Sequence, residues 1–227
     1  MFKSLSSTLS GVSVLFFCFF LMSCSGTTKQ YMSPDVNGDN SNEPVSLLVI
    51  DRNDFPGIDS DHRFGELRIN EQPLFQQRLL TLFREATGAN VKSEMRALDV
   101  DQSSFQVREF TEGGTNLRFV APASGTALKS DSESPRFVVM LDGFRFDRYE
   151  ELVGGDSYAG HEPDVVPRMK FETNYLIWDN DVQKAVAWGT IDSDSVIEIA
   201  RINEIYEQLI LDSLQRMNRM SPFGSRG

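Results

Sequence analysis

The sequence has few of the side chains that most often form metal or catalytic sites. Among its 227 residues there are only two cysteines, Cys18 and Cys24, and only two histidines, His62 and His161. Two cysteines allow one disulfide at most. Histidine is the usual acid or base near neutral pH, and both histidines stand in polar stretches. The chemistry available to this chain is therefore narrow.

Basic residues are outnumbered. The chain has 22 Lys and Arg against 33 Asp and Glu, a formal net charge of −11. Nucleic acids and anionic lipid surfaces attract clustered positive charge, so this composition argues against either as a direct ligand. We interpret the acidity as an aid to solubility and predict no nucleic-acid partner.

Long apolar runs are also missing. The longest lies at residues 12–22, is interrupted by Ser13 and Cys18, and follows Lys3. A membrane-spanning helix needs about 20 apolar residues, whereas the apolar region of a signal peptide needs only about 7–15. The run therefore predicts a secretory signal peptide, with an uncleaved anchor helix as the alternative.

The end of this segment, Leu21-Met22-Ser23-Cys24, resembles the lipobox of bacterial lipoproteins. The resemblance implies that residues 1–23 form a lipoprotein signal peptide and that Cys24 becomes the lipidated first residue, with a multi-chain acyl anchor. Stable anchoring takes more than one acyl chain. Ordinary cleavage elsewhere, with Cys24 as a plain thiol, is the alternative. By the same resemblance, Ser25 after the cysteine favours the outer membrane.

Such processing leaves about 200 residues, which suits one domain plus a tail. Cys18 departs with the leader, so the mature chain has no internal disulfide and no zinc site built on several cysteines. Residues 25–44 are rich in Ser, Thr, Asn, Asp, Gly and Pro and bury little apolar surface. We predict a flexible tether over 24–44 and a single periplasmic α/β domain over 45–220, with surface exposure of the domain as an alternative.

The hydrophobic pattern within the domain predicts strands and two helices. The first helix begins at a cap, Asn70, and ends at Gly88; the second covers 203–217, with a possible helical turn over 195–201 before it. Expected strands cover 45–50, 105–110, 117–120, 136–146, 169–178 and 185–191, with a loop over 151–167. The fold class is α+β: a two-layer sandwich of a mixed or antiparallel sheet with two helices packed on one face.

Three polar stretches invite a metal interpretation. Residues 59–62 and 161–164 each combine acidic residues with one histidine, which a solvated loop explains equally well. Residues 35–46 begin like a calcium loop, but Asn40 and Ser46 stand where the motif needs glycine and glutamate. We therefore predict no metal and no cofactor.

No catalytic motif is complete. No serine stands in a Gly-x-Ser-x-Gly context with partners, and neither Gly-Gly pair has the strand-then-helix setting of a phosphate loop. Paired carboxylates occur at Glu150 with Glu151 and at Asp192 with Asp194, as expected by chance in an acidic chain. The sequence predicts no enzyme; an envelope hydrolase using loop carboxylates is the alternative.

Aromatic residues gather on the last expected hairpin. Trp178 and Trp188 stand on its two arms, with Tyr175 and Phe171 nearby. Such residues pack well across strands, and they are also enriched in binding surfaces. We therefore name Tyr175, Trp178 and Trp188 as a possible partner surface, or as a glycan-binding strip in the surface-display alternative, with core packing as the competing interpretation.

The segments 136–146, 175–179 and 185–189 together resemble small bacterial envelope lipoproteins. Two groups share the pattern: auxiliary lipoproteins of transport systems, and lipoproteins with a domain like the amino-terminal part of the Tol-system propeller protein, including activators of cell-wall synthases. The resemblance implies a non-catalytic, membrane-anchored lipoprotein that binds or positions another envelope component, with an envelope protein as partner. It transfers no binding residues to this chain.

Overall fold

The computed structural model describes residues 29–36, 40–50, 72–95, 99–129, 134–155 and 162–224. The predicted signal peptide, Cys24 and the two histidine-containing stretches around His62 and His161 lie outside these residues. Among the described residues, no helix has the length and apolar character needed to span a bilayer.

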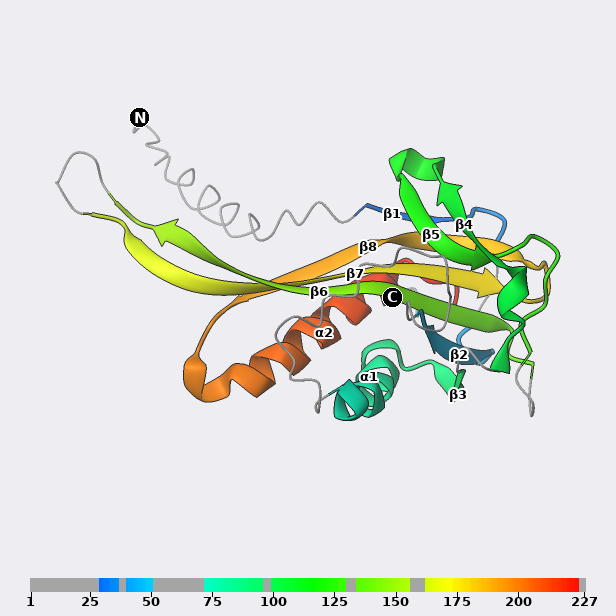
Figure 1. Cartoon of the computed structure of the whole chain (residues 1–227), viewed down its shortest axis with the longest axis horizontal. Coiled ribbons are helices and arrows are strands. Elements are labelled where there is room, and N and C mark those ends of the chain that lie inside the picture. The colour runs from blue at the N-terminus through cyan, green and yellow to red at the C-terminus, as the bar shows by residue number, and fades with distance from the viewer. Residues whose placement is uncertain are drawn as a thin grey trace, which may run out of the picture.

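The chain forms a mixed α/β structure with one large mixed sheet and two helices (Figure 1). Six strands lie in the order β1-β8-β7-β6-β2-β3, and β2 runs parallel to both of its neighbours while the other pairs are antiparallel. The strands of this sheet are β1 (Gln30–Met32), β2 (Pro44–Val49), β3 (Asn90–Met95), β6 (Phe137–Val153), β7 (Asp164–Asp179) and β8 (Lys184–Val196). The helices are α1 (Gln72–Thr87) and α2 (Ile202–Arg219), and a separate hairpin joins β4 (Phe105–Phe110) to β5 (Leu117–Pro122).

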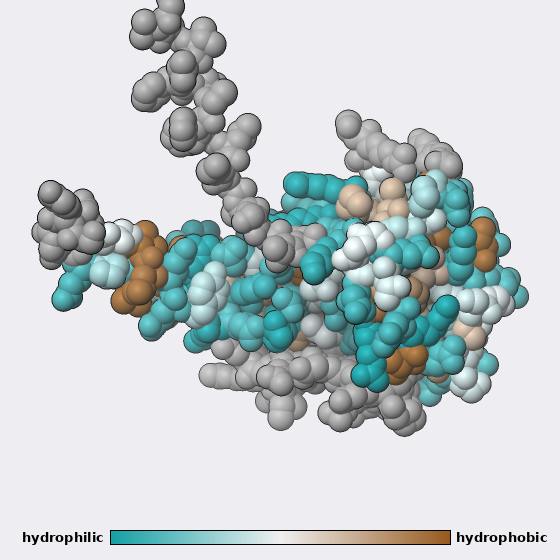
Figure 2. All heavy atoms as spheres, turned by 90° about the horizontal axis from the view of Figure 1, so that it is seen from above, coloured by the Kyte–Doolittle hydropathy of each residue, from teal (hydrophilic) through white to brown (hydrophobic). Residues whose placement is uncertain are grey.

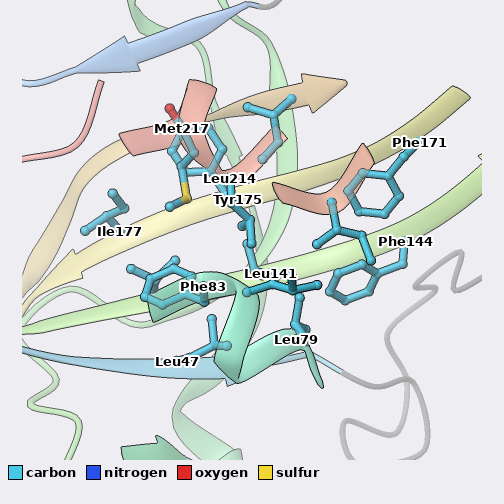
Figure 3. Packing of buried hydrophobic residues seen from close by; sticks show 14 of the residues in the cluster. Leu47, Leu79, Phe83, Leu141, Phe144, Phe171, Tyr175, Ile177, Leu214 and Met217 are labelled. Carbon is cyan, nitrogen blue, oxygen red and sulfur yellow. The ribbon is translucent and has the colours of Figure 1, made fainter. Parts of the chain in front are cut away.

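Both helices lie on one face of the sheet, where a large apolar core separates them from the strands (Figures 1 and 3). Phe83 of α1 and Met217 of α2 are fully buried there against Leu141 and Ile177 of the sheet. Figure 3 shows the side chains from sheet and helices meeting in this layer. The mixed sheet and its two helices agree with the predicted α+β class.

The other face of the sheet is covered by the β4–β5 hairpin, which the sequence predicts without placing. Residues on this face alternate with those facing the helices, as strand geometry requires. Val138 and Met140 therefore pack with Phe119 and Val120 of β5 in a second core. On this face, opposite the helices, the hairpin covers only one end of the sheet (Figure 1).

Both helices match the sequence pattern closely. The α1 helix ends at Thr87, and Gly88 follows with φ +60° and donates its N–H to the carbonyl of Arg84 at 3.0 Å. Glycine adopts this left-handed conformation without a steric cost. The α2 helix extends the predicted span by one residue at its start and two at its end. The helical turn expected over 195–201 is confirmed only in part: Ile199–Arg201 form a short 3-10 turn, whereas Ser195 and Val196 belong to β8.

The loop predicted over 151–167 is wrong for most of its described residues. β6 continues to Val153 and β7 begins at Asp164, so the two strands pair almost to their ends. Charged residues on both faces, together with Gly154, Gly155 and Pro167, suggested a loop. The strand tolerates Pro167 because the regular pairing with β8 ends at Arg168, and the backbone bond at Pro167 uses its carbonyl, which accepts from the Ile197 N–H at 2.8 Å, and does not need an N–H from proline.

The predicted tether over 24–44 is also wrong in part. Residues 30–32 form β1, which pairs with β8, and Asn40 is buried with its side-chain amide donating to the carbonyl of Pro222 at 3.2 Å. Gly189 makes the pairing possible, because a Cβ at that position would lie 2.5 Å from the Lys29 carbonyl oxygen. Described structure therefore begins well before Val45, the expected start of the domain.

Candidate functional site

The three aromatic residues proposed as a partner surface are buried. Tyr175 and Trp178 are 0% exposed and Trp188 is 4% exposed. Both indole N–H groups are bonded inside the protein, Trp178 to the Thr126 carbonyl and Trp188 to the Thr115 hydroxyl, each at 3.0 Å. The partner-surface interpretation is therefore wrong for these residues, and core packing explains them.

These aromatic residues also lie on opposite faces of the sheet. Tyr175 faces the helices, and its hydroxyl donates to the side chain of Gln30 at 2.9 Å, while burial raises its pKa. Trp188 faces the hairpin and packs on Tyr31, with ring centroids 4.3 Å apart. Tyr175, Trp178 and Trp188 therefore form no continuous strip for a glycan to stack on, so the hairpin glycan alternative loses its basis.

A different feature has an exposed face: an arm in which β6, β7 and β8 continue past their neighbours β2 and β1, with α2 beneath its first part and only β6 and β7 projecting beyond the helix (Figure 1). We define the arm as residues 145–153, 164–172 and 192–196. The pairing of β2 with β6 ends at Leu141, and that of β1 with β8 ends at Gly189. Within the described residues, the arm is thus a three-stranded ribbon that becomes two-stranded after β8 ends at Val196.

A bulge marks the junction between body and arm. The register of β6 against β7 shifts between Asp142 and Arg145, and Gly143 in between has φ +68°. The Thr173 hydroxyl donates to the Asp142 carbonyl at 2.9 Å and stabilises the bulged backbone. Bulges bend a strand and increase its twist, so the arm leaves the body in a direction set at this point.

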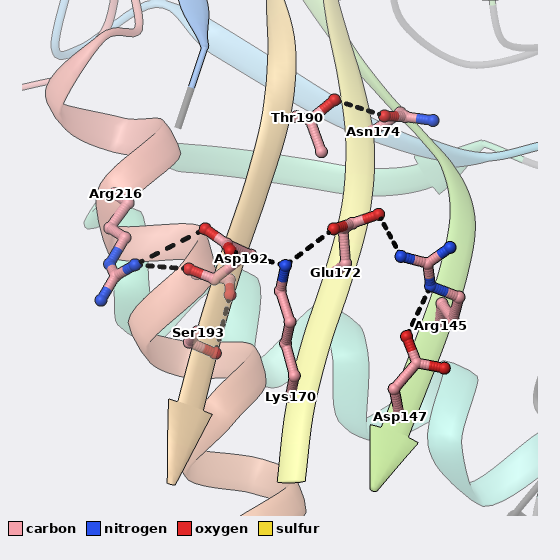
Figure 4. Close-up of polar contacts among 10 residues, drawn as sticks. Arg145, Asp147, Lys170, Glu172, Asn174, Thr190, Asp192, Ser193 and Arg216 are labelled. Atoms are coloured by element: carbon pink, nitrogen blue, oxygen red, sulfur yellow. Dashed lines mark hydrogen bonds and ion pairs between the residues drawn. The ribbon is translucent and has the colours of Figure 1, made fainter. Parts of the chain in front are cut away.

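One surface of the arm, the charged face, carries acidic side chains on all three strands and basic side chains on β6 and β7. Its residues are Arg145, Asp147, Tyr149, Glu151, Arg168, Lys170, Glu172, Asp192 and Asp194. Lys170 on the central strand lies 2.9 Å from Asp192 and 3.0 Å from Glu172, and Glu172 in turn lies 2.8 Å from Arg145 (Figure 4). The charged face is a ladder of cross-strand ion pairs.

The ladder continues toward the tip and toward α2. Arg168 contacts both Glu151, at 2.8 Å, and Asp194, and the Tyr149 hydroxyl donates to Asp194 at 3.1 Å. Burial acts to lower the pKa of Lys170 and of Arg168, but hydrogen bonds to their carboxylate partners outweigh it and raise both pKa values. These bases stay charged at neutral pH, which suits recognition rather than proton transfer.

Behind the bulge lies a carboxyl group that the sequence interpretation did not single out. Asp142 is 7% exposed, and burial raises its pKa from 3.8 to about 6, against the lowering effect of the Gly143 N–H. Asn174 stands opposite Asp142 on β7, and its side-chain oxygen accepts a hydrogen bond from the Thr190 hydroxyl at 2.7 Å. A single aspartate within an apolar strand carried no sequence signal for such burial.

The end of the arm is apolar. Leu152 and Val165 stand directly opposite each other and are 66% and 55% exposed. Six of the eight large exposed apolar side chains among the described residues lie on the arm or at its base, where Figure 2 shows apolar colour near the arm end: Tyr149, Leu152, Val153, Val165, Val196 and Ile199. Adjoining exposed apolar side chains mark a contact surface, and Leu152 with Val165 at the arm end form such a pair.

The carboxylate pairs named from the sequence do not converge on a catalytic centre among the described residues. Glu150 and Glu151 alternate between the two faces of β6, as neighbours in a strand must. Asp192 and Asp194 are bound by Lys170 and Arg168. Within the described ranges, no group of three or more His, Cys, Asp and Glu side chains is placed to hold a metal ion.

No protein-family model and no curated protein matches this sequence. Several solved structures share part of its arrangement at low similarity. The PelC dodecamer from Paraburkholderia phytofirmans is 11% identical, with 84% of this chain and 97% of that chain covered and a TM-score of 0.39. A minor lipoprotein from Acinetobacter baumannii is 10% identical, with 78% and 90% covered and a TM-score of 0.34.

A homolog of the neuraminyllactose-binding hemagglutinin from Helicobacter pylori is 12% identical, with 80% of this chain and 83% of that chain covered and a TM-score of 0.37. The neighbours thus include a small lipoprotein. Their identities and TM-scores are too low to indicate what this chain binds, so its function has to be argued from its own residues.

Proposed function

We propose that this chain is a lipid-anchored, non-catalytic lipoprotein of the outer membrane whose periplasmic domain binds or positions another component of the cell envelope. The N-terminal segment supports the location, since its short apolar run and Ser23-Cys24 junction are typical of lipoprotein processing. The arm supports the binding role.

The observation that carries the proposal is the charged face of the arm. Its acidic and basic side chains hold one another in a fixed cross-strand order, with Lys170 and Arg168 each shared between two carboxylates. A surface of ordered, partly exposed charge recognises a partner by electrostatic complementarity. A catalytic site instead needs groups aimed at one reacting atom. The hydrolase alternative stays a hypothesis, since residues 51–71 and 156–161 lie outside the described structure.

The anchor is tested by replacing Cys24 with alanine and separating membranes from soluble material. The wild-type protein should sediment with membranes and resist washing at high salt, whereas C24A should appear in the soluble fraction. Retention of C24A in the washed membranes would overturn the lipid anchor.

The binding role is tested with Lys170→Glu, which places a third negative charge between Asp192 and Glu172. The matched control is Lys184→Glu at the other end of the sheet, where the lysine forms one long ion pair of 3.5 Å with Asp35. Both full-length variants are used to capture partners from detergent-solubilised envelopes. A stoichiometric partner should be recovered with wild type and K184E and lost with K170E; recovery of none with wild type contradicts the proposal.

A further inference from the structure

The direction in which the chain enters β1 relates the anchor to the arm. β1 is antiparallel to β8, with Gln30 opposite Gly189, and the Thr190 N–H donates to the Lys29 carbonyl at 3.2 Å. In this orientation, going backward along β1 means going forward along β8, toward the arm. At Lys29, where the described residues begin, the N-terminal direction of the backbone therefore points toward the side on which the arm projects (Figure 1).

The link between the anchor and the body is short. Four residues lie between Cys24 and Lys29, and the five fully extended Cα steps from one to the other span at most about 18 Å. Beyond the level of Thr190, the arm continues for nine residues of β7, from Asn174 to Val165, or about 30 Å. In the other direction, β8 extends six residues from Thr190 to Lys184, or about 20 Å.

The link between Cys24 and Lys29 is thus shorter than the arm on one side of Thr190 and shorter than the rest of β8 on the other side. If the arm pointed straight at the bilayer, its end would pass the anchored residue by about 12 Å and enter the lipid. If the arm pointed straight away, the far end of the body would block the anchor from reaching the membrane. A lipid on Cys24 therefore brings the arm against the bilayer, either lying along it or tilted into it.

The apolar end of the arm is suited to such a contact. Leu152 and Val165 form an exposed pair, and Val153 beside them is 47% exposed. We propose that Leu152, Val153 and Val165 dock on the surface of the same membrane that holds the Cys24 anchor. This inference rests on the proposed lipid anchor and adds the orientation of the domain on the membrane.

The charge of the arm specifies the lipid. Acidic residues outnumber basic ones on the arm, seven (Asp147, Glu150, Glu151, Asp164, Glu172, Asp192 and Asp194) against four (Arg145, Arg148, Arg168 and Lys170). Anionic lipid repels such a surface, and apolar insertion into a zwitterionic interface does not need positive charge. The docking surface therefore fits a zwitterionic membrane.

The test places a thiol at the end of the arm. The lipid occupies Cys24 in the mature protein, so Val165→Cys adds the single free thiol. The matched control is Val182→Cys, in the turn at the opposite end of the same strands, because Val182 and Val165 are 53% and 55% exposed. Each full-length lipidated variant carries an environment-sensitive fluorophore and is reconstituted in phosphatidylcholine vesicles with and without a quencher on the acyl chains.

Quenching should be at least threefold stronger at position 165 than at position 182, and it should weaken when a third of the lipid is anionic. Equal quenching at the two positions on protein that sediments with the vesicles overturns the docking. A concentration-dependent change at position 165 in detergent alone also overturns it, because the arm would then meet a second copy of the chain. Failure of both variants to bind vesicles would instead contradict the anchor itself.

Discussion

The same three strands build two regions with opposite surfaces, the body and the arm. In the body, β7 is covered on both sides, so that Ile177 and Trp178 are both fully buried on opposite faces. In the arm, the same strand continues with Lys170 and Arg168 on a charged, partly exposed face. What changes at the junction is the face that carries Lys170 and Arg168, which the hairpin no longer covers. The opposite face stays apolar over the first part of the arm, where Phe146 and Phe171 pack against α2. Apolar burial therefore stabilises the body and this first part, and ion pairs hold the charged face.

The largest expected difference is between one buried and one exposed side chain. Trp178→Ala removes a fully buried ring and its hydrogen bond to Thr126, and we expect a loss of about 3–5 kcal/mol in the free energy of unfolding. Leu152→Ala at the arm end should cost less than about 0.5 kcal/mol, since surface substitutions have small effects. Urea unfolding of both variants measures the contrast. Equal losses would show that the arm end is packed as tightly as the body.

The junction between the two regions should respond to pH. The raised pKa of Asp142, about 6 against 3.8, means that the folded protein binds the proton more tightly than the unfolded chain. The contribution of this group to stability is therefore greatest below pH 3.8 and declines as the pH rises to about 6. A shift of about two pKa units corresponds to about 3 kcal/mol at most.

Asp142→Asn removes this dependence. The variant should be more stable than wild type at pH 7.5, by up to about 3 kcal/mol, and similar to it at pH 3.5. Asp147→Asn, on the exposed arm, is the control and should show no such gain. The measurement is urea unfolding of all three proteins across this pH range. A wild-type advantage at pH 7.5 would mean that the Asp142 carboxylate is needed in its charged form.

The body was largely predictable and the arm was not, for a physical reason. Apolar residues in the body recur with the period of a strand or helix, because one face of each element is buried. Toward the end of the arm both faces are exposed, so Glu150, Glu151 and Arg168 produce no alternation, and Gly154 and Pro167 suggest a loop. Only the cross-strand partners, which are remote in sequence, show that this segment is a ribbon.

The same limit explains the errors in the candidate site. Trp178 and Trp188 carry the same signal whether they are exposed or buried, and only the position of the β4–β5 hairpin decides between the two. The segment at β1 is polar and short, and its pairing depends on the missing side chain of Gly189. Neither the burial of the two tryptophans nor the pairing of β1 follows from local sequence, since each depends on a contact with a strand that is distant in the sequence.

The close approach at Gly189 holds β1 against β8, and Gly189→Ala should release β1. The added Cβ would lie 2.5 Å from the Lys29 carbonyl and 2.9 Å from the Gln30 Cα. Backbone neighbours cannot move aside as a flexible side chain does, so we expect a loss of about 1–3 kcal/mol. Hydrogen exchange should increase at residues 30–32 and stay unchanged in the centre of β7. Unchanged exchange in β1 would contradict the tight approach of the two strands.

The smallest effect should come from the charged face. Arg168→Met removes the cation between Glu151 and Asp194, and exposed ion pairs of this kind contribute about 0–1 kcal/mol. We therefore expect a loss of at most about 1 kcal/mol in low salt, shrinking further in 1 M salt because the charges are then screened. Arg201→Met is the control, since Arg201 pairs with Glu204 on the surface of a helix, and it should change stability even less.

The arm can lose such a contact at little global cost because the core of the body does not depend on it. Local opening of the arm should nevertheless increase, and hydrogen exchange at residues 150–153 would report it while the body stays protected. A loss above about 2 kcal/mol would exceed what exposed ion pairs provide. It would mean that arm and body unfold as one unit, with the charged face acting as a structural extension of the core and not as a surface held ready for a partner.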